Sequence, residues 1–152
     1  MEDIRKIMVV SRMSEDSHRA IHYGVSLARK LGAELMVIHT IHNPFSVEGW
    51  NLPIPSLVEE YEKILKKTKD ELDSIIRVET KKGMQVKEII RKGDPTKEVL
   101  KAIKEENIDL LVMSAHEEGH LEHFLFGRSN EEITRKMPCS IMLVRMQPGP
   151  AH

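Results

Sequence analysis

The sequence predicts an α/β protein built on a five-stranded, mostly parallel sheet that is doubly wound, with helices on both of its faces. Two observations predict this fold class. Short continuous apolar runs, typical of strands buried on both sides, alternate with segments whose apolar residues recur at helical spacing. The order of strand and helix along the chain requires right-handed crossovers between parallel strands. At 152 residues the chain suits a single domain. We expect this domain to span residues 1–146, followed by a disordered tail at 147–152.

Each strand and helix has its own local signal. Continuous apolar runs predict strands at 7–10, 35–41, 108–113 and 141–144, and a weaker alternating pattern at 86–91 predicts a strand nearer an edge. Helix starts are predicted from capping residues, which accept hydrogen bonds from otherwise unpaired backbone N–H groups. These residues are Ser14, Ser56 and Ser129 (the last two each opening a capping box) and Asp94, which precedes Pro95.

Composition excludes several classes of function. Acidic and basic residues nearly cancel, giving a formal net charge of −1, so no overall charge favours nucleic acid or a membrane surface. No apolar run has the length of a transmembrane helix, and the N-terminus lacks the order of a signal peptide. The single cysteine, Cys139, cannot form an internal disulfide. We therefore expect a cytoplasmic protein without nucleic-acid or membrane partners.

The segment from Ile108 to Val144 carries the main functional signal. A buried strand leads into a loop at 114–127, then into a helix start near Ser129 and a final strand. This order places a helix N-terminus beside strand ends, where α/β sheets bind phosphates. The loop has the length of a nucleotide-binding loop but lacks most of its glycines.

Four segments in this order resemble the universal stress protein family, and the resemblance covers nearly the whole chain. They are Lys6–Val9 followed by Ser14–Ser17, Leu35–His39, Gly93–Pro95 followed by Ile108–Met113, and Met137–Val144. The resemblance implies a Rossmann-like sheet of order 3-2-1-4-5, with a ligand cleft between the first and fourth strands. It also implies a homodimer formed through the last strand. The residues agree, because Ile141, Met142, Leu143 and Val144 form an apolar strand with no successor to cover its edge.

Many members of this family bind ATP through a loop with glycines at set spacing. The corresponding positions here are Ser114, Glu117, Gly127 and Arg128, so only Gly127 is kept, and Ser129 lies one residue late for the expected hydroxyl. Arg12 stands where the family places an aspartate after the first strand, and Met13 replaces the small residue that follows it. The nucleotide-binding motif is therefore degenerate.

These departures oppose binding of a triphosphate. The missing glycines remove close backbone approach and positive φ, and Glu117 brings negative charge toward the phosphates. Our hypothesis is that Arg12 pairs with Glu117 and fills the cleft in place of the nucleotide. We accordingly expect no cofactor.

The alternative is a nucleotide-binding switch with an altered site that holds ATP. Arg12, Gly127, Arg128 and Ser129 would then contact the phosphates, and Thr40 at the end of the second strand would lie near the base. Ser129 can instead be a plain helix cap, and Arg128 a solvated surface side chain.

A third interpretation is metal binding by the loop. His116-Glu117-Glu118-Gly119-His120 matches the zinc-peptidase pattern, but Gly119 and the position just after a strand do not suit the long helix that such enzymes use. A non-catalytic site built from His116, His120 and His123 stays open.

Together these interpretations predict a stress-response protein similar to the universal stress proteins. It would lack the usual ATP binding and would act through dimerisation and through contacts with an unidentified protein partner. We expect no enzyme, with weak ATPase activity left open.

Overall fold

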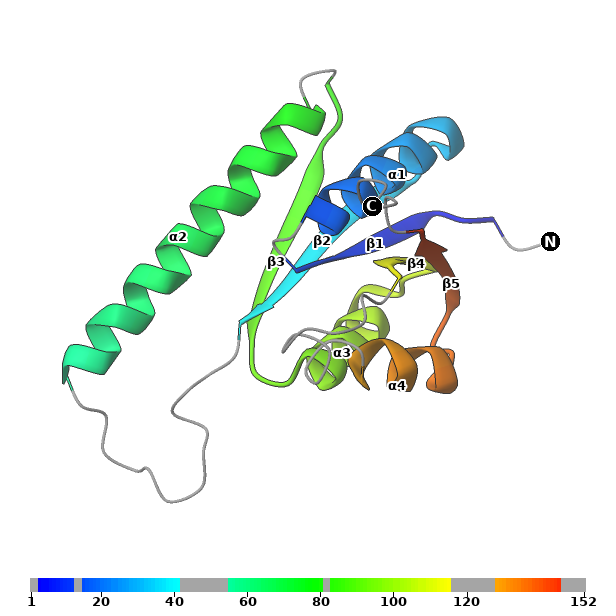
Figure 1. Cartoon of the computed structure of the whole chain (residues 1–152). Helices are drawn as coiled ribbons and strands as arrows, with labels where there is room; N and C mark the ends of the chain where they lie inside the picture. Colours follow the sequence, from blue (N-terminus) through cyan, green and yellow to red (C-terminus); the bar gives the residue numbers. More distant parts are fainter. Residues whose placement is uncertain (1–2, 13–14, 42–54, 81–82, 116–127, 146–152) are drawn as a thin grey trace, which may run out of the picture.

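A computed structural model describes residues 3–12, 15–41, 55–80, 83–115 and 128–145, without the side chains of 15–17, 55–57 and 128–130. Statements below refer to these residues. The chain alternates strand and helix from end to end (Figure 1). The predicted tail at 147–152, most of the loop at 114–127 and the capping residue Ser14 lie outside the described residues.

Five strands form one sheet in the order β3-β2-β1-β4-β5, and the four strand pairings are all parallel. The strands are β1 (Lys6–Ser11), β2 (Glu34–Ile41), β3 (Val86–Lys92), β4 (Leu110–Ser114) and β5 (Ser140–Val144). Both the predicted fold class and the order implied by the family resemblance are confirmed.

Helices cover both faces of the sheet. One apolar cluster joins the sheet to α1 (Glu15–Leu31) and α2 (Pro55–Thr80), and the other joins it to α3 (Pro95–Glu106) and α4 (Arg128–Lys136). Alternate residues of β1 enter the two clusters, with Ile7 and Val9 in the first and Met8 and Val10 in the second. This alternation explains the continuous apolar runs, because a central strand is buried on both sides.

The two edge strands differ from the three central ones. In β3 only Ile89 is fully buried, in agreement with the predicted edge position. Lys87 and Arg91 of β3 pair with Glu106 and Glu105 of α3, at 2.9 and 2.8 Å. Charged side chains of this kind protect an exposed strand edge from further pairing.

The fourth strand begins later than the sequence predicted. The strand was expected at 108–113 but β4 spans Leu110–Ser114. The backbone N–H of Ile108 donates to the carbonyl of Ile103, which ties Ile108 to the last turn of α3 and keeps it out of the strand. The Asp109 carboxylate accepts hydrogen bonds from the backbone N–H groups of Arg5 and Lys6, which ties the start of β4 to the start of β1.

The predicted N-cap is confirmed for α3, and the starts of α2 and α4 lie within one residue of their predicted caps. The Asp94 carboxylate accepts a hydrogen bond from the Lys97 N–H at 3.0 Å, as expected for the N-cap of α3. The helices α2 and α4 begin at Pro55 and Arg128, each one residue before the serine expected to cap it. The side chains of Ser56 and Ser129 are not described, so their capping role stays a prediction. A capping box fixes a helix start only to within a residue or two.

Candidate functional site

The carboxyl ends of β1, β2 and β4 meet at one edge of the sheet. From β1 the chain order runs outward through β2 on one side and through β4 on the other, so the order reverses between β1 and β4. Ligands of open α/β sheets bind at such a reversal, beside the carboxyl ends of the strands. Among the described residues this edge is the candidate site.

Polar side chains are buried at this edge. Ser11, His39 and Ser114, which end or nearly end their strands, are only 2%, 9% and 7% exposed. Ser11 and His39 are also register partners in the β1–β2 ladder. The described interior is otherwise almost wholly apolar, with Thr96 of α3 the other buried polar residue.

His39 joins the ends of two strands. Its Nδ1 lies 2.7 Å from the carbonyl oxygen of Ser11. A carbonyl can only accept, so Nδ1 carries the proton and Nε2 is the unprotonated nitrogen of the neutral ring. Burial lowers the pKa of His39, outweighing the hydrogen bond to Ser11 and the nearby Glu71 carboxylate, which both act to raise it. At neutral pH the ring is therefore an uncharged clamp between β1 and β2.

Three residues that the sequence singled out lie at the same edge of the sheet as this clamp. Arg12 follows β1 directly and is half-buried, Thr40 is half-buried next to His39, and Ser114 is the buried last residue of β4. The three residues come from strands that adjoin one another and reach the same edge of the sheet.

The structure does not describe the side chains of the remaining predicted site residues. Glu117 and Gly127 lie outside the described residues, and Arg128 and Ser129 open α4 with side chains that are likewise not described. The proposed pairing of Arg12 with Glu117 therefore stays a prediction.

Sequence reasoning missed Ser11 and His39. His39 lies inside the apolar run of a central strand, and such a run predicts burial but no functional role. One feature of the sequence could have identified the pair. His39 is a polar residue near the carboxyl end of one predicted strand, and Ser11 is a polar residue at the carboxyl end of another.

The metal interpretation also stays a prediction. Within the described residues no three His, Cys, Asp or Glu side chains are grouped to hold a metal ion. His116, His120 and His123 lie outside them.

The last strand has the features of an open edge. In β5 Val144 is buried, Ile141 and Met142 are half-buried, and Leu143 is 51% exposed. Among the strands that the structure describes, β5 pairs with β4 alone. An apolar strand in this position is suited to pairing with another chain.

Of the helices that the structure describes, none combines the length and the apolar character needed to cross a bilayer.

Comparison with known proteins gives consistent matches. The sequence profile of the universal stress protein family matches residues 3–145. Universal stress protein MJ0577 of Methanocaldococcus jannaschii is 24% identical in sequence, over 93% of this chain and 94% of that protein. Its solved structure superposes with a TM-score of 0.77 at 23% identity, covering 97% of this chain and all of the other.

Two further solved structures hold nucleotides. A universal stress protein in complex with cAMP has a TM-score of 0.61 at 17% identity, covering 94% of this chain and 98% of the other. The universal stress protein from Archaeoglobus fulgidus in complex with dAMP has a TM-score of 0.60 at 18% identity, with the same two coverages. These two likenesses concern the fold. With the family profile matching nearly the whole chain and the sheet order in agreement, the chain belongs to the universal stress protein family.

Proposed function

We propose that this chain is a universal stress protein that does not hold ATP in the family's usual way. It acts in the cytoplasm as a homodimer, through contacts with a protein partner in a stress response. The observation that carries the proposal is the pair of residues at the sheet reversal. A half-buried arginine, Arg12, follows β1, and a buried serine, Ser114, ends β4.

Ser114 supports the proposal through sterics. The family resemblance puts a glycine of the phosphate loop at this position. Ser114 is the register partner of Val144, and the next N–H, that of Ala115, donates to the carbonyl of Val144 at 2.8 Å. The backbone at Ser114 is therefore committed to the sheet, and its side chain occupies space that a glycine would leave open.

Arg12 supports the proposed loss of ATP binding, because it replaces a carboxylate that recognises adenosine in the family. In the resemblance this position is an aspartate that holds the adenosine. A carboxylate can accept hydrogen bonds from ribose hydroxyls, whereas a guanidinium has donors only. Replacing the one by the other removes that contact and leaves a half-buried cation beside the clamp made by His39 and Ser11.

The open edge of β5 supports the dimer. Pairing of two β5 strands would satisfy the unpaired backbone groups of both edges and cover Leu143.

The test is extraction of bound nucleotide. The purified chain is denatured, and the supernatant is analysed by ion-pair chromatography for adenine nucleotides. We expect none above background. A matched variant restores the family residues: Arg12→Asp, Ser114→Gly, Glu117→Gly and Arg128→Ser. We expect this variant to retain nucleotide. ATP recovered in near-stoichiometric amount from the unaltered chain would overturn the proposal.

A second candidate is binding of a nucleotide with a single phosphate. The observation that favours it is the pair of relatives solved with cAMP and dAMP. A single phosphate needs fewer backbone N–H contacts from a glycine-rich loop than a triphosphate does. The Arg12 guanidinium could pair with it. Titration calorimetry with cAMP, AMP and ATP would separate the candidates. Saturable binding of the monophosphates alone, lost in Arg12→Ala, would favour the second candidate over the first.

A further inference from the structure

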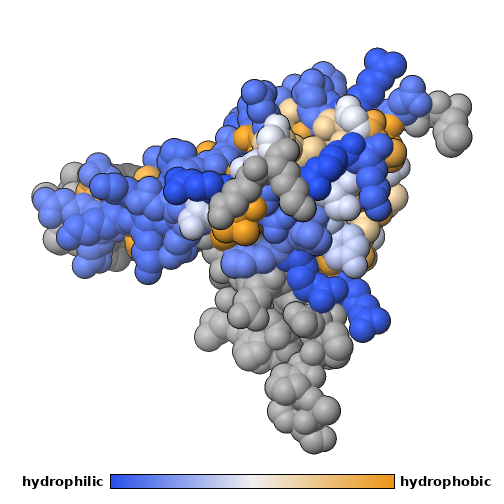
Figure 2. Space-filling view, turned by 90° about the horizontal axis from the view of Figure 1, so that it is seen from above, coloured by the Kyte–Doolittle hydropathy of each residue, from blue (hydrophilic) through white to orange (hydrophobic). Residues whose placement is uncertain are grey.

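The outward face of α2 is uncovered along several turns of the helix, among the residues that the structure describes. The opposite side of α2 faces the core, where Leu72 and Ile76 are buried against the sheet. Figure 1 shows α2 at the flank of the molecule, beyond the edge strand β3. From above, the side chains drawn in colour on that side of the molecule are mostly hydrophilic, with a few hydrophobic ones among them (Figure 2).

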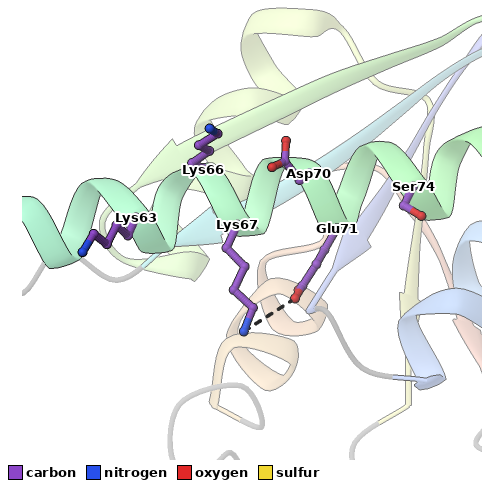
Figure 3. A pocket seen from close by; sticks show the side chains of 6 residues that line it. All are labelled: Lys63, Lys66, Lys67, Asp70, Glu71 and Ser74. Carbon is purple, nitrogen blue, oxygen red and sulfur yellow. Dashed lines mark ion pairs between the residues drawn. The ribbon is translucent and has the colours of Figure 1, made fainter.

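The side chains of this face form one longitudinal stripe. They recur at intervals of three and four residues, which keeps them on one side of the helix. All six are exposed, and they line a shallow hollow of about 420 Å³ (Figure 3). In chain order they are Lys63, Lys66, Lys67, Asp70, Glu71 and Ser74. We call this set, together with the exposed Glu60 and Arg77 one turn beyond each end, the α2 stripe.

Charge is ordered along the α2 stripe in a self-complementary way. Consider two copies of α2 packed antiparallel through their stripes, related by a two-fold axis that crosses each helix at the level midway between Thr68 and Lys69. Residues equally far from this level along the two helices then face each other. Lys67 then faces Asp70 of the second copy, and Lys66 faces Glu71 of the second copy.

The same register holds at both ends of the stripe. Lys63 faces Ser74 of the second copy, and Glu60 faces Arg77 of the second copy. Each of these contacts occurs twice, because a two-fold interface is isologous. No position of the stripe meets a like charge.

The ion pair that already exists within the stripe is weak, so its side chains could turn to a second copy of the chain at little cost in free energy. Lys67 and Glu71 form an ion pair within the stripe that is long, at 3.9 Å, and their side chains are 78% and 49% exposed. Exposed pairs of this kind within one helix contribute only a few tenths of a kcal/mol.

We propose that the α2 stripe is a self-association surface whose partner is a second copy of this chain, docked antiparallel about the Thr68–Lys69 axis. The contact is weak and sensitive to salt, because exposed ion pairs contribute little singly and are screened at high ionic strength. It lies over the β3 side of the sheet, at the opposite end from β5. Together the two surfaces would join dimers into larger assemblies. The inference goes beyond the proposed function and does not depend on it.

Charge reversal provides the test. Lys66→Glu/Lys67→Glu makes the middle of the stripe wholly negative, and Asp70→Lys/Glu71→Lys makes it wholly positive. Sedimentation velocity at low salt should show self-association through α2 at least about tenfold weaker in either variant than in the unaltered chain. An equal mixture of the two variants should associate at least as strongly as the unaltered chain, because every pair of charged residues that meets across the stripe between unlike variants has opposite signs. All of this association should weaken when salt is raised from about 0.05 M to about 0.5 M.

The matched control is Lys97→Glu/Lys101→Glu on α3, which changes net charge as the first variant does but leaves α2 intact. It should associate like the unaltered chain and gain nothing when mixed with the positive variant. Circular dichroism would confirm that each variant is folded. The proposal fails if the mixture associates no more than its components, or if the α3 control behaves like the α2 variant. Each comparison is repeated with Leu143→Lys in all chains, so that a failure of β5 pairing is distinguished from a failure of the α2 contact.

Discussion

His39 connects a single side chain to the geometry of the candidate site. Its hydrogen bond to the Ser11 carbonyl spans the β1–β2 ladder one residue before Arg12 and Thr40. Replacing His39 by alanine would leave that carbonyl without this donor in a buried place, at a cost of about 1–3 kcal/mol.

The lowered pKa of His39 makes part of the stability depend on pH. In the unfolded chain a histidine titrates near 6.5, and burial holds the folded value lower. As pH falls below 6.5, the unfolded state therefore takes up a proton that the folded state does not, and the free energy of unfolding decreases. His39→Asn keeps an N–H donor but does not titrate, so it should lose less stability on acidification. Urea unfolding of both proteins at about pH 7.5 and about pH 5 checks this, and equal losses would show that His39 is not the group responsible.

At the scale of elements, α1 lies so close to β1 that only glycine fits between them. A Cβ on Gly24 would overlap Cγ2 of Val9 and come within 3.3 Å of Leu35 Cδ1. Both neighbours belong to the core, where space is gained only by moving a helix or a strand.

Gly24→Ala should therefore destabilise the fold by about 1–3 kcal/mol, although alanine favours a helix. The Val9→Ala variant removes the overlapping methyl group. In the double variant the cost of Gly24→Ala should be largely relieved, which a double-mutant cycle by urea unfolding would measure. Additive costs would mean that the overlap is absorbed elsewhere.

The long helix α2 is attached to β3 by a charged cluster. Lys69 Nζ lies 3.2 Å from Asp73 and 3.3 Å from Glu88. Burial, followed by the hydrogen bond with Asp73, raises the pKa of Glu88, whereas the hydrogen bond with Glu88 and the Lys69 ammonium lower the pKa of Asp73.

These opposite directions predict opposite mutational effects. A raised carboxyl pKa means that stability is lost as pH rises through it, so Glu88→Gln should gain stability relative to the unaltered chain as pH rises above 4.5. A lowered pKa means that stability is present at neutral pH and is lost in acid, so Asp73→Asn should be less stable at neutral pH. Each change should stay below about 1 kcal/mol because both carboxyl groups are only half-buried and water still screens their charges. Thermal unfolding across pH measures both, and effects of the same sign would contradict this arrangement.

At the scale of the whole molecule, periodicity predicted the class of fold but not the order of the strands. Apolar runs identify strands such as β1 and β2 because burial on both faces leaves no polar alternation. The order within the sheet came from the family resemblance, because parallel strands joined by helices can be arranged in more than one way. The predicted strand ends imply that Arg12, Thr40 and Ser114 lie at one edge of the sheet, and the structure places them there. They could not reveal the role of His39, which depends on its ladder partner Ser11.

The proposed dimer predicts a specific effect of charge in β5. Leu143→Lys should shift the protein toward monomer in sedimentation experiments, because a lysine on an edge strand opposes pairing with another edge. Leu31→Lys is the matched control, since Leu31 is similarly exposed, at 50% against 51%, but ends α1. If both variants stay dimeric, or both dissociate, pairing through β5 is wrong.

The central claim is that bulky and charged side chains at the sheet reversal have replaced the ATP site. Mass analysis of small molecules released from the denatured protein, purified without added nucleotide, tests it most directly. The account predicts no ATP or ADP from the unaltered chain and recovery of nucleotide from the variant with the family residues restored. About one equivalent of ATP or ADP per chain from the unaltered protein would contradict it.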